Sequence, residues 1–280
     1  MEHFVEVEWL AKHIDDPTVT IVDARSAALT VYYASLGREQ YFSGHIPGAI
    51  HLDYATDLND PETGYAARVA PPQRFAAVAG NAGIGNTTTV IAYDGGDAPY
   101  AARLVWMFHY YGHDEAAILT GGIDAWIAAG LARVSEIPSL DAQQFAPRLR
   151  PQLRASREEV LEIAKGRSDV QLLSVWSATA YAMRDREIVG ARHLSWSQLF
   201  DEAHGGRLAP IDKLRELTAD LDPHRRTITY CGNGVNAAGA YFALLAVGFT
   251  DVAVYDGSWA EWSHDKLPTR GSSHRPGDGL

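Results

Sequence analysis

Cysteine is almost absent from this chain, which holds a single one, Cys231, among 280 residues. A lone cysteine excludes an intramolecular disulfide. It also fits a reducing compartment, in which a reactive thiol persists without being oxidised. We therefore expect a cytoplasmic protein in which any cysteine chemistry belongs to Cys231.

Basic residues are in the minority, with 24 Lys and Arg against 35 Asp and Glu, a formal net charge of −11 and a pI near 5.4. Nucleic acids and anionic membrane surfaces are bound through an excess of Lys and Arg. This charge balance argues against either of them as the main partner. An anionic substrate must therefore be held by a few local groups.

Long hydrophobic runs are missing as well. No stretch of the sequence approaches the roughly 18 apolar residues of a membrane span. The first eight residues contain no basic region followed by an apolar run, as a secretory signal would. We expect no membrane association, and a cytosolic enzyme is the default interpretation.

Cys231 stands where an enzyme places a nucleophile. It follows the strand-like run 226–230 and precedes a turn with Gly232 and Gly234, after which an apolar, alanine-rich stretch predicts a helix. Main-chain N–H groups and the positive end of a helix dipole stabilise a thiolate and any anion beside it. Free cysteine is usually a buried hydrophobe, but this glycine-rich context favours a nucleophile. The loop residues predicted to bind the substrate are Gly232, Asn233, Gly234, Val235 and Asn236.

Short β-branched runs alternate with helical patterns along the whole chain, which predicts an α/β fold with parallel sheets flanked by helices. The first half has predicted strands at 19–23, 88–93 and 117–119, and predicted helices at 72–79, 100–111 and 123–129. The second half has predicted strands at 170–174, 227–230 and 252–255, with predicted helices at 157–165, 213–221 and after Cys231. Ser156 and Glu159 have the spacing of a capping box at the start of the first of these helices.

The two halves also echo one another, which predicts an internal duplication. Residues 89–102 match 227–238 in kind and order, with Asp94 at the position of Cys231. The glycine–tryptophan block 117–126 echoes 253–262, and 48–53 echoes 190–195. The length suits two domains. We predict a non-catalytic domain at 1–130, a proline- and arginine-containing linker at 131–155 and a catalytic domain at 156–280.

Four motifs resemble the two-domain sulfurtransferases of the rhodanese type, and the likeness covers nearly the whole chain. The motifs are Ser43-Gly-His-Ile-Pro-Gly-Ala49, Tyr93-Asp-Gly95, the loop 231–237 and Tyr255-Asp-Gly-Ser-Trp-Ala-Glu-Trp262. The resemblance implies two tandem rhodanese-like domains, the first of them inactive. It also implies transfer of a sulfane sulfur from thiosulfate or 3-mercaptopyruvate to cyanide or a thiol, through a persulfide on Cys231 and without a cofactor.

The chain departs from the family at two positions that bear on the substrate. Gly232 is closer to the mercaptopyruvate branch, but Asn233 replaces the serine of that branch and the lysine of the thiosulfate branch. The family's arginine before an aromatic residue corresponds here to Ala180, followed by Tyr181. Arg184 or Arg186 compensates in this interpretation, because a guanidinium grips a carboxylate or sulfonate through paired N–H groups.

Three other functions remain as alternatives. A rhodanese-like module that binds an anion or a partner without turnover is the rival from another class. A cysteine-dependent phosphatase is disfavoured because Ala237 stands where its arginine is needed. A metal site is disfavoured because His109 and His113 lack the glutamate pattern of a zinc helix; we expect this pair to pack at a helix end.

Two further patterns are interpreted as structural. The glycines of the segment 80–85 precede a strand instead of following one, so they indicate a helix C-cap and turn and not a dinucleotide loop. The aromatic run 106–111 has helical spacing and is typical of a core.

Overall fold

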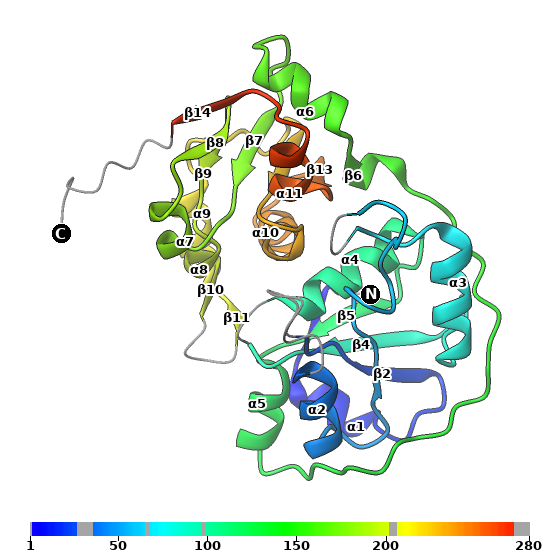
Figure 1. Ribbon diagram of the computed structural model, residues 1–280. Helices are drawn as coiled ribbons and strands as arrows, with labels where there is room; N and C mark the ends of the chain where they lie inside the picture. Colours follow the sequence, from blue (N-terminus) through cyan, green and yellow to red (C-terminus); the bar gives the residue numbers. More distant parts are fainter. Residues whose placement is uncertain (1, 27–35, 65–67, 97–98, 202–205, 272–280) are drawn as a thin grey trace. The chain divides into compact units, whose positions relative to one another are not determined.

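The computed structural model describes residues 2–26, 36–64, 68–96, 99–201 and 206–271 (Figure 1). The chain divides into two compact units between Arg150 and Pro151, except that residues 206–207 group with the first unit. Each unit has its own hydrophobic core. We describe the two units separately.

The first unit alternates strands and helices from its beginning. Its elements are β1 (Phe4–Val5), α1 (Val7–Lys12), β2 (Val19–Asp23), α2 (Leu36–Ser43), β3 (Ile50–His51), α3 (Pro72–Asn81), β4 (Thr89–Tyr93), α4 (Tyr100–Tyr110), β5 (Ala116–Leu119) and α5 (Gly122–Ala128). The strands form one sheet in the order β1-β5-β4-β2-β3. Every pairing in this sheet is parallel.

The second unit repeats this plan with additions. Its elements are the 3₁₀ turn Pro151–Leu153, β6 (Arg154–Ala155), α6 (Arg157–Ala164), β7 (Gln171–Ser174), α7 (Ala178–Ala182), β8 (Arg186–Ile188), β9 (Arg192–His193), α8 (Trp196–Leu199), β10 (Phe200–Asp201), β11 (Arg207–Leu208), α9 (Ile211–Leu217), β12 (Thr227–Tyr230), α10 (Val235–Ala246), β13 (Val252–Tyr255), α11 (Ser258–His264) and β14 (Thr269–Gly271). The main sheet has the order β6-β13-β12-β7-β9, all parallel, and β14 pairs with β8 antiparallel.

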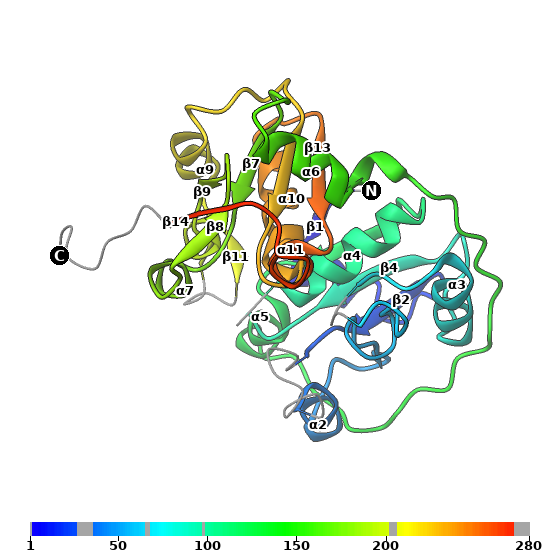
Figure 2. The same cartoon turned by 45° about the horizontal axis from the view of Figure 1, so that its top comes forward.

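The α/β prediction is therefore confirmed: each unit contains a five-stranded parallel sheet flanked by helices. The strands β4 and β12 occupy equivalent central positions, and their residues are almost all buried because helices cover both faces. The helix α4 packs against β4 and β5, and α10 packs against β12 and β13. Figure 2 shows α4 beside β4 and α10 beside β13. The alanines and the glycine of α10 let it approach its sheet closely, and nine of its residues are buried.

The predicted capping box at Ser156 forms in part. The Ser156 hydroxyl accepts a hydrogen bond from the N–H of Glu159 at 3.1 Å. The Glu159 carboxylate, however, forms an ion pair with Arg226 and does not reach back to the helix start. The hydroxyl alone therefore caps α6.

The stretch 131–150, predicted as part of a linker, has no helix but packs along the first unit. Phe145 is buried, and Arg148 and Arg150 each donate a main-chain hydrogen bond, at 2.8 Å, to Tyr111 and Tyr110 respectively. A Cβ on Gly80 would lie 2.5 Å from the carbonyl oxygen of Gln143. This segment is thus fixed along its length by main-chain contacts.

The features interpreted as structural are core or turn residues. The residues 106–111 are all buried. His109 and His113 are 4% and 2% exposed and lie at the end of α4 and just after it. Residues 80–81 end α3, and Gly83 follows in the left-handed conformation, φ = 76°. Among the described residues, no helix is both long and apolar enough to cross a bilayer.

Candidate active site

Cys231 directly follows β12, the central strand of the second sheet, and the loop 231–234 leads into α10. Ligands of open parallel sheets bind at the carboxyl ends of the strands, which is where this loop lies. Gly234 has φ = 88° and forms the N-cap of α10. A left-handed conformation at this position favours glycine, so Gly234 allows the chain to turn from strand to helix within four residues.

The sulfur of Cys231 lies against the start of α10. The N–H of Gly234 donates a hydrogen bond to Cys231 Sγ at 3.2 Å. The first N–H groups of a helix have no partner within the helix, and Val235 and Asn236 supply two of them here. Together with the helix dipole they form a positive environment for a thiolate or a bound anion. Cys231 itself is only 2% exposed, so a donor must be small to reach it.

A second loop holds the backbone of Cys231 in place. The N–H of Cys231 donates to Ser258 Oγ at 3.3 Å, and the Ser258 hydroxyl donates to the carbonyl of Tyr255 at 2.8 Å. The N–H of Trp259 in turn donates to the carbonyl of Cys231 at 3.0 Å. Ser258 is fully buried and has φ = 49°, a conformation that costs energy for a residue with a Cβ. The glycine–serine–tryptophan motif therefore fixes the cysteine loop.

Arg184 follows α7 and lies between two tryptophan rings beside the loop. Its Cζ is 4.0 Å from the ring centroid of Trp176 and 4.2 Å from that of Trp259. A Cβ on Gly232 would lie 2.8 Å from the Trp176 ring, so Trp176 packs directly on the cysteine loop. Cation–π contacts with the two rings orient the guanidinium beside the cysteine loop.

The charge state of Arg184 is set by its burial and by nearby ionisable groups. Burial lowers the pKa of the Arg184 guanidinium, while the nearby ionisable groups of Tyr230, Asp185 and Cys231 act in the opposite direction. A guanidinium remains charged at any physiological pH despite such a shift. Arg184 is thus a half-buried cation beside the cysteine loop.

Arg186, the other arginine predicted to bind the substrate, lies elsewhere. It belongs to β8, its side chain is exposed, and its Nη1 donates to Thr269 Oγ1 on β14 at 3.5 Å. The alternation of side chains along a strand turns it away from its neighbour Glu187, which is buried. Of the two arginines, Arg184 is therefore the one that the fold brings to the cysteine loop.

A buried carboxylate anchors the strand next to Arg184. Glu187 is 1% exposed, accepts a hydrogen bond from the Tyr181 hydroxyl at 2.8 Å and pairs with Arg270 at 2.8 Å. The Tyr181 ring stacks on His193 with centroids 3.7 Å apart. Tyr181 thus serves as a packing residue that connects α7 to the sheet.

The equivalent loop of the first unit carries Asp94. Its carboxylate accepts hydrogen bonds from the N–H of Gly96 at 2.9 Å and from the N–H of Ala101, at the start of α4, at 2.8 Å. Asp94 thus occupies a helix N-terminus with a negative charge of its own. No group of three or more His, Cys, Asp or Glu side chains able to hold a metal occurs in the part of the chain that the structure describes.

Three residues beside Cys231 were not identified from the sequence as site residues: Trp176, Ser258 and Trp259. The last two lie within the C-terminal motif 255–262, so that motif was the available signal for them. Trp176 carries no such signal, because only the pairing of β7 with β12 brings it to the loop.

Two α/β units of this kind, with a cysteine at the start of a helix in one of them, define the class of protein. A family model described as "Rhodanese-like domain" matches residues 6–129 and 156–265. The chain belongs to the rhodanese family and contains two copies of its domain, as the resemblance predicted.

The relatives narrow the class to an enzyme. The thiosulfate sulfurtransferase of Corynebacterium glutamicum is 30% identical over 94% of this chain and 88% of its own length. The 3-mercaptopyruvate sulfurtransferase of Escherichia coli is 30% identical over 92% of this chain and 94% of its own. The crystal structure of SseA from Escherichia coli superposes with a TM-score of 0.83 at 28% identity, covering 92% of this chain and 99% of that one. The chain is a sulfurtransferase with two rhodanese domains.

Proposed function

We propose that the protein transfers a sulfur atom from thiosulfate or 3-mercaptopyruvate to cyanide or a thiol, and that Cys231 carries the sulfur as a persulfide. The observation that carries this proposal is the hydrogen bond from the Gly234 N–H to Cys231 Sγ at the start of α10. Donors at the sulfur stabilise the thiolate before reaction and the persulfide anion after it. We disfavour the alternative of a non-catalytic binding module, because relatives that match most of this chain are named as sulfurtransferases.

In the first half-reaction the Cys231 thiolate attacks the outer sulfur of the donor. With thiosulfate, the S–S bond breaks and sulfite leaves with the bonding electron pair. With 3-mercaptopyruvate, the C–S bond breaks, and the thiol proton ends on the methyl carbon of pyruvate. Both routes leave a persulfide on Cys231 and consume no oxidant or reductant.

In the second half-reaction a nucleophile attacks the outer sulfur of the persulfide. Cyanide becomes thiocyanate and a thiol becomes a persulfide, while the electron pair of the broken S–S bond returns to Cys231 as a thiolate. The loop N–H groups of residues 232–236 stabilise the sulfur anion in both states.

Arg184 holds the anionic end of the donor in this proposal. Its guanidinium lies next to the loop, is oriented by Trp176 and Trp259, and matches the paired oxygens of a carboxylate or of the sulfonate end of thiosulfate. Because the chain has a net charge of −11, an anionic donor must be held by a local positive group, and Arg184 supplies it in this proposal. Arg186 has no role in this assignment.

Asn233 bears on the choice of donor. Its side chain is neutral and offers no group that can move a proton at neutral pH. Formation of pyruvate requires a proton on carbon, whereas sulfite can leave as an anion. We therefore expect faster turnover with thiosulfate than with 3-mercaptopyruvate. A lone thiol in an enzyme of this kind also favours the cytoplasm as its location.

Steady-state assays with the two donors side by side, and cyanide as acceptor, test the proposal. We expect thiocyanate to form with both donors in the wild type and with neither in the Cys231→Ser variant. Thiocyanate formation by that variant at the wild-type rate would falsify the role of Cys231.

A further inference from the structure

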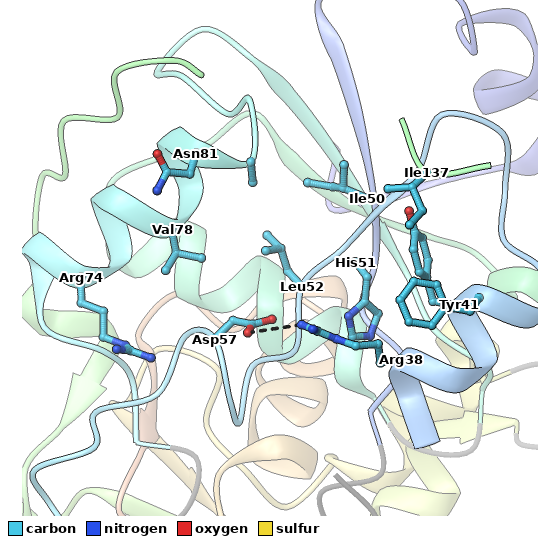
Figure 3. A pocket seen from close by; sticks show the side chains of 12 residues that line it. Arg38, Tyr41, Ile50, His51, Leu52, Asp57, Arg74, Val78, Asn81 and Ile137 are labelled. Atoms are coloured by element: carbon cyan, nitrogen blue, oxygen red, sulfur yellow. Dashed lines mark ion pairs between the residues drawn. The ribbon is translucent and has the colours of Figure 1, made fainter. Parts of the chain in front are cut away.

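The first unit, which does not contain Cys231, has a pocket of about 530 Å³ that the sulfur-transfer reaction does not use (Figure 3). It lies between α2 and α3, with β3 and the residue that follows this strand behind it, and Ile137 from the segment 131–150 lies at one end. Pockets that bind small molecules in proteins fall in the range of about 300–1,000 Å³. The volume therefore suits a ligand of small-molecule size.

The back and part of the rim of this pocket are apolar. Leu52 is buried and lies beside Ile50 and Val78, which are half-buried. At the rim, Phe42 is 49% exposed and Ile137 is 60% exposed. Large apolar side chains exposed together around a concave site indicate a surface that a ligand covers. An apolar body of the ligand would contact these groups.

The charged side chains of the pocket gather along one side of it. Arg38 extends from α2 toward Asp57, with 3.8 Å between the guanidinium and the carboxylate (Figure 3). Arg74 on α3 donates one hydrogen bond, to the carbonyl of Thr56 at 3.2 Å. Within the described ranges no carboxylate lies within ion-pair distance of Arg74. Two guanidinium groups and one carboxylate leave the pocket with an excess of one positive charge.

That excess is unusual in a chain with a net charge of −11, and one negative charge on a ligand would balance it. We propose that this pocket binds a small organic monoanion, an apolar and preferably aromatic body that carries one carboxylate or sulfonate group. The anionic group would lie against Arg74, which has no carboxylate partner among the described residues, because guanidinium groups bind such oxyanions with paired N–H donors. The body would fill the space between Leu52, Val78 and Ile137. The inference is independent of the sulfur-transfer mechanism, since it uses no residue of the second unit.

Two fluorescent probes of the same shape and different charge test this site on the full chain. The anionic probe is 8-anilinonaphthalene-1-sulfonate, and the neutral probe is N-phenyl-1-naphthylamine, which lacks the sulfonate. We expect Arg74→Gln to raise the dissociation constant of the anionic probe about fivefold or more, because a charge-assisted hydrogen bond is lost, and to leave the neutral probe within about twofold. Arg167, an exposed arginine of the second unit that does not line the pocket, supplies the control: Arg167→Gln should change the binding of neither probe.

A second pair of variants tests the apolar part of the pocket. Val78→Phe fills the space, and Phe42→Ala removes an exposed rim residue without disturbing the core. We expect each to weaken the binding of both probes about threefold or more, with thermal denaturation confirming that the variants fold. The proposal is overturned if Arg74→Gln leaves the anionic probe unchanged, if Arg167→Gln weakens it equally, or if the folded apolar variants bind both probes as the wild type does.

Discussion

The loops at Asp94 and Cys231 are built on the same frame but hold different side chains. In each, a tyrosine ends a central strand and is followed directly by Asp94 or Cys231. A glycine N–H a few residues later donates to the side chain of that residue, and a helix begins shortly afterwards. The Asp94 carbonyl accepts the N–H of Ile123 at 3.0 Å, as that of Cys231 accepts the N–H of Trp259. The first loop therefore carries a built-in anion, whereas the second carries the thiol that we propose as the nucleophile.

The residue two positions after the neighbouring strand also differs between the two units. Arg25, the residue two after Asp23 at the end of β2, is tied to the Asp23 carboxylate and to the carbonyl of Gly44. At the same point in the second unit, Trp176 packs on the cysteine loop and on Arg184. The aromatic side chain of Trp176 thus contacts the cation that we propose as the substrate-binding group, whereas Arg25 at the equivalent position forms a structural ion pair.

Replacing Arg184 should have the largest effect of the variants that leave Cys231 intact. We expect Arg184→Gln to lower kcat/KM for thiosulfate about 100-fold, roughly 2.7 kcal/mol, because the charge-assisted grip on the donor is lost. Arg186→Gln should change it less than about twofold, since that side chain is exposed and bonded to Thr269. Equal losses in the two variants, measured by steady-state kinetics, would show that proximity to Trp176 and Trp259 does not select the substrate arginine.

Removing the built-in anion of the first loop should affect stability and not chemistry. Asp94→Ala leaves the N–H groups of Gly96 and Ala101 without their acceptor and removes a negative charge from the start of α4. We expect a loss of about 1–2 kcal/mol in the free energy of unfolding of the first unit. Urea denaturation measures this loss. An unchanged midpoint would mean that solvent replaces the carboxylate without cost.

Ser258 offers a smaller test of how the second loop is positioned. Both Ser258→Ala and Ser258→Gly remove the acceptor of the Cys231 N–H, and we expect each to lower kcat roughly tenfold with little change in KM. The glycine variant should be the more stable of the two, because glycine adopts φ = 49° without strain. A fall in stability without a change in kcat would restrict Ser258 to a structural role.

Asn233 should have the smallest effect, on the ratio of the two donors. Asn233→Ser introduces a hydroxyl beside the sulfur that can relay a proton. We expect the ratio of turnover with 3-mercaptopyruvate to turnover with thiosulfate to rise about threefold or more. A fall in that ratio would argue against proton delivery as the basis of donor choice.

The sequence predicted the α/β class, the duplication and the loop at Cys231, because strand and helix periods and glycine turns are local signals. It also indicated Arg184 and Arg186 as candidates, but local signals could not decide between them. Which arginine lies beside the cysteine depends on the path of the chain after α7, and the Trp176 contact depends on the register that pairs Ser174 with Tyr230. The left-handed conformation of Ser258 has no sequence signal, since serine rarely adopts it.

For the segment 131–150, the sequence predicts the irregular backbone but not how the segment packs. Its prolines and lack of period predict irregular structure, which is present. Its packing through Phe145 and through contacts to Gly80 and Tyr111 depends on complementary surfaces far apart in the sequence. Composition reports that a segment is irregular, but not whether it is fixed in place.

The most direct test of the account is the intact mass of the protein after brief exposure to thiosulfate, followed by removal of the donor. We expect the wild type to gain about 32 Da, the mass of one sulfur atom held as a persulfide, and to lose it again on addition of cyanide. The Cys231→Ser variant should gain nothing. A wild type that turns over thiosulfate without ever carrying this mass, or a Cys231→Ser variant that carries it, contradicts the persulfide on Cys231.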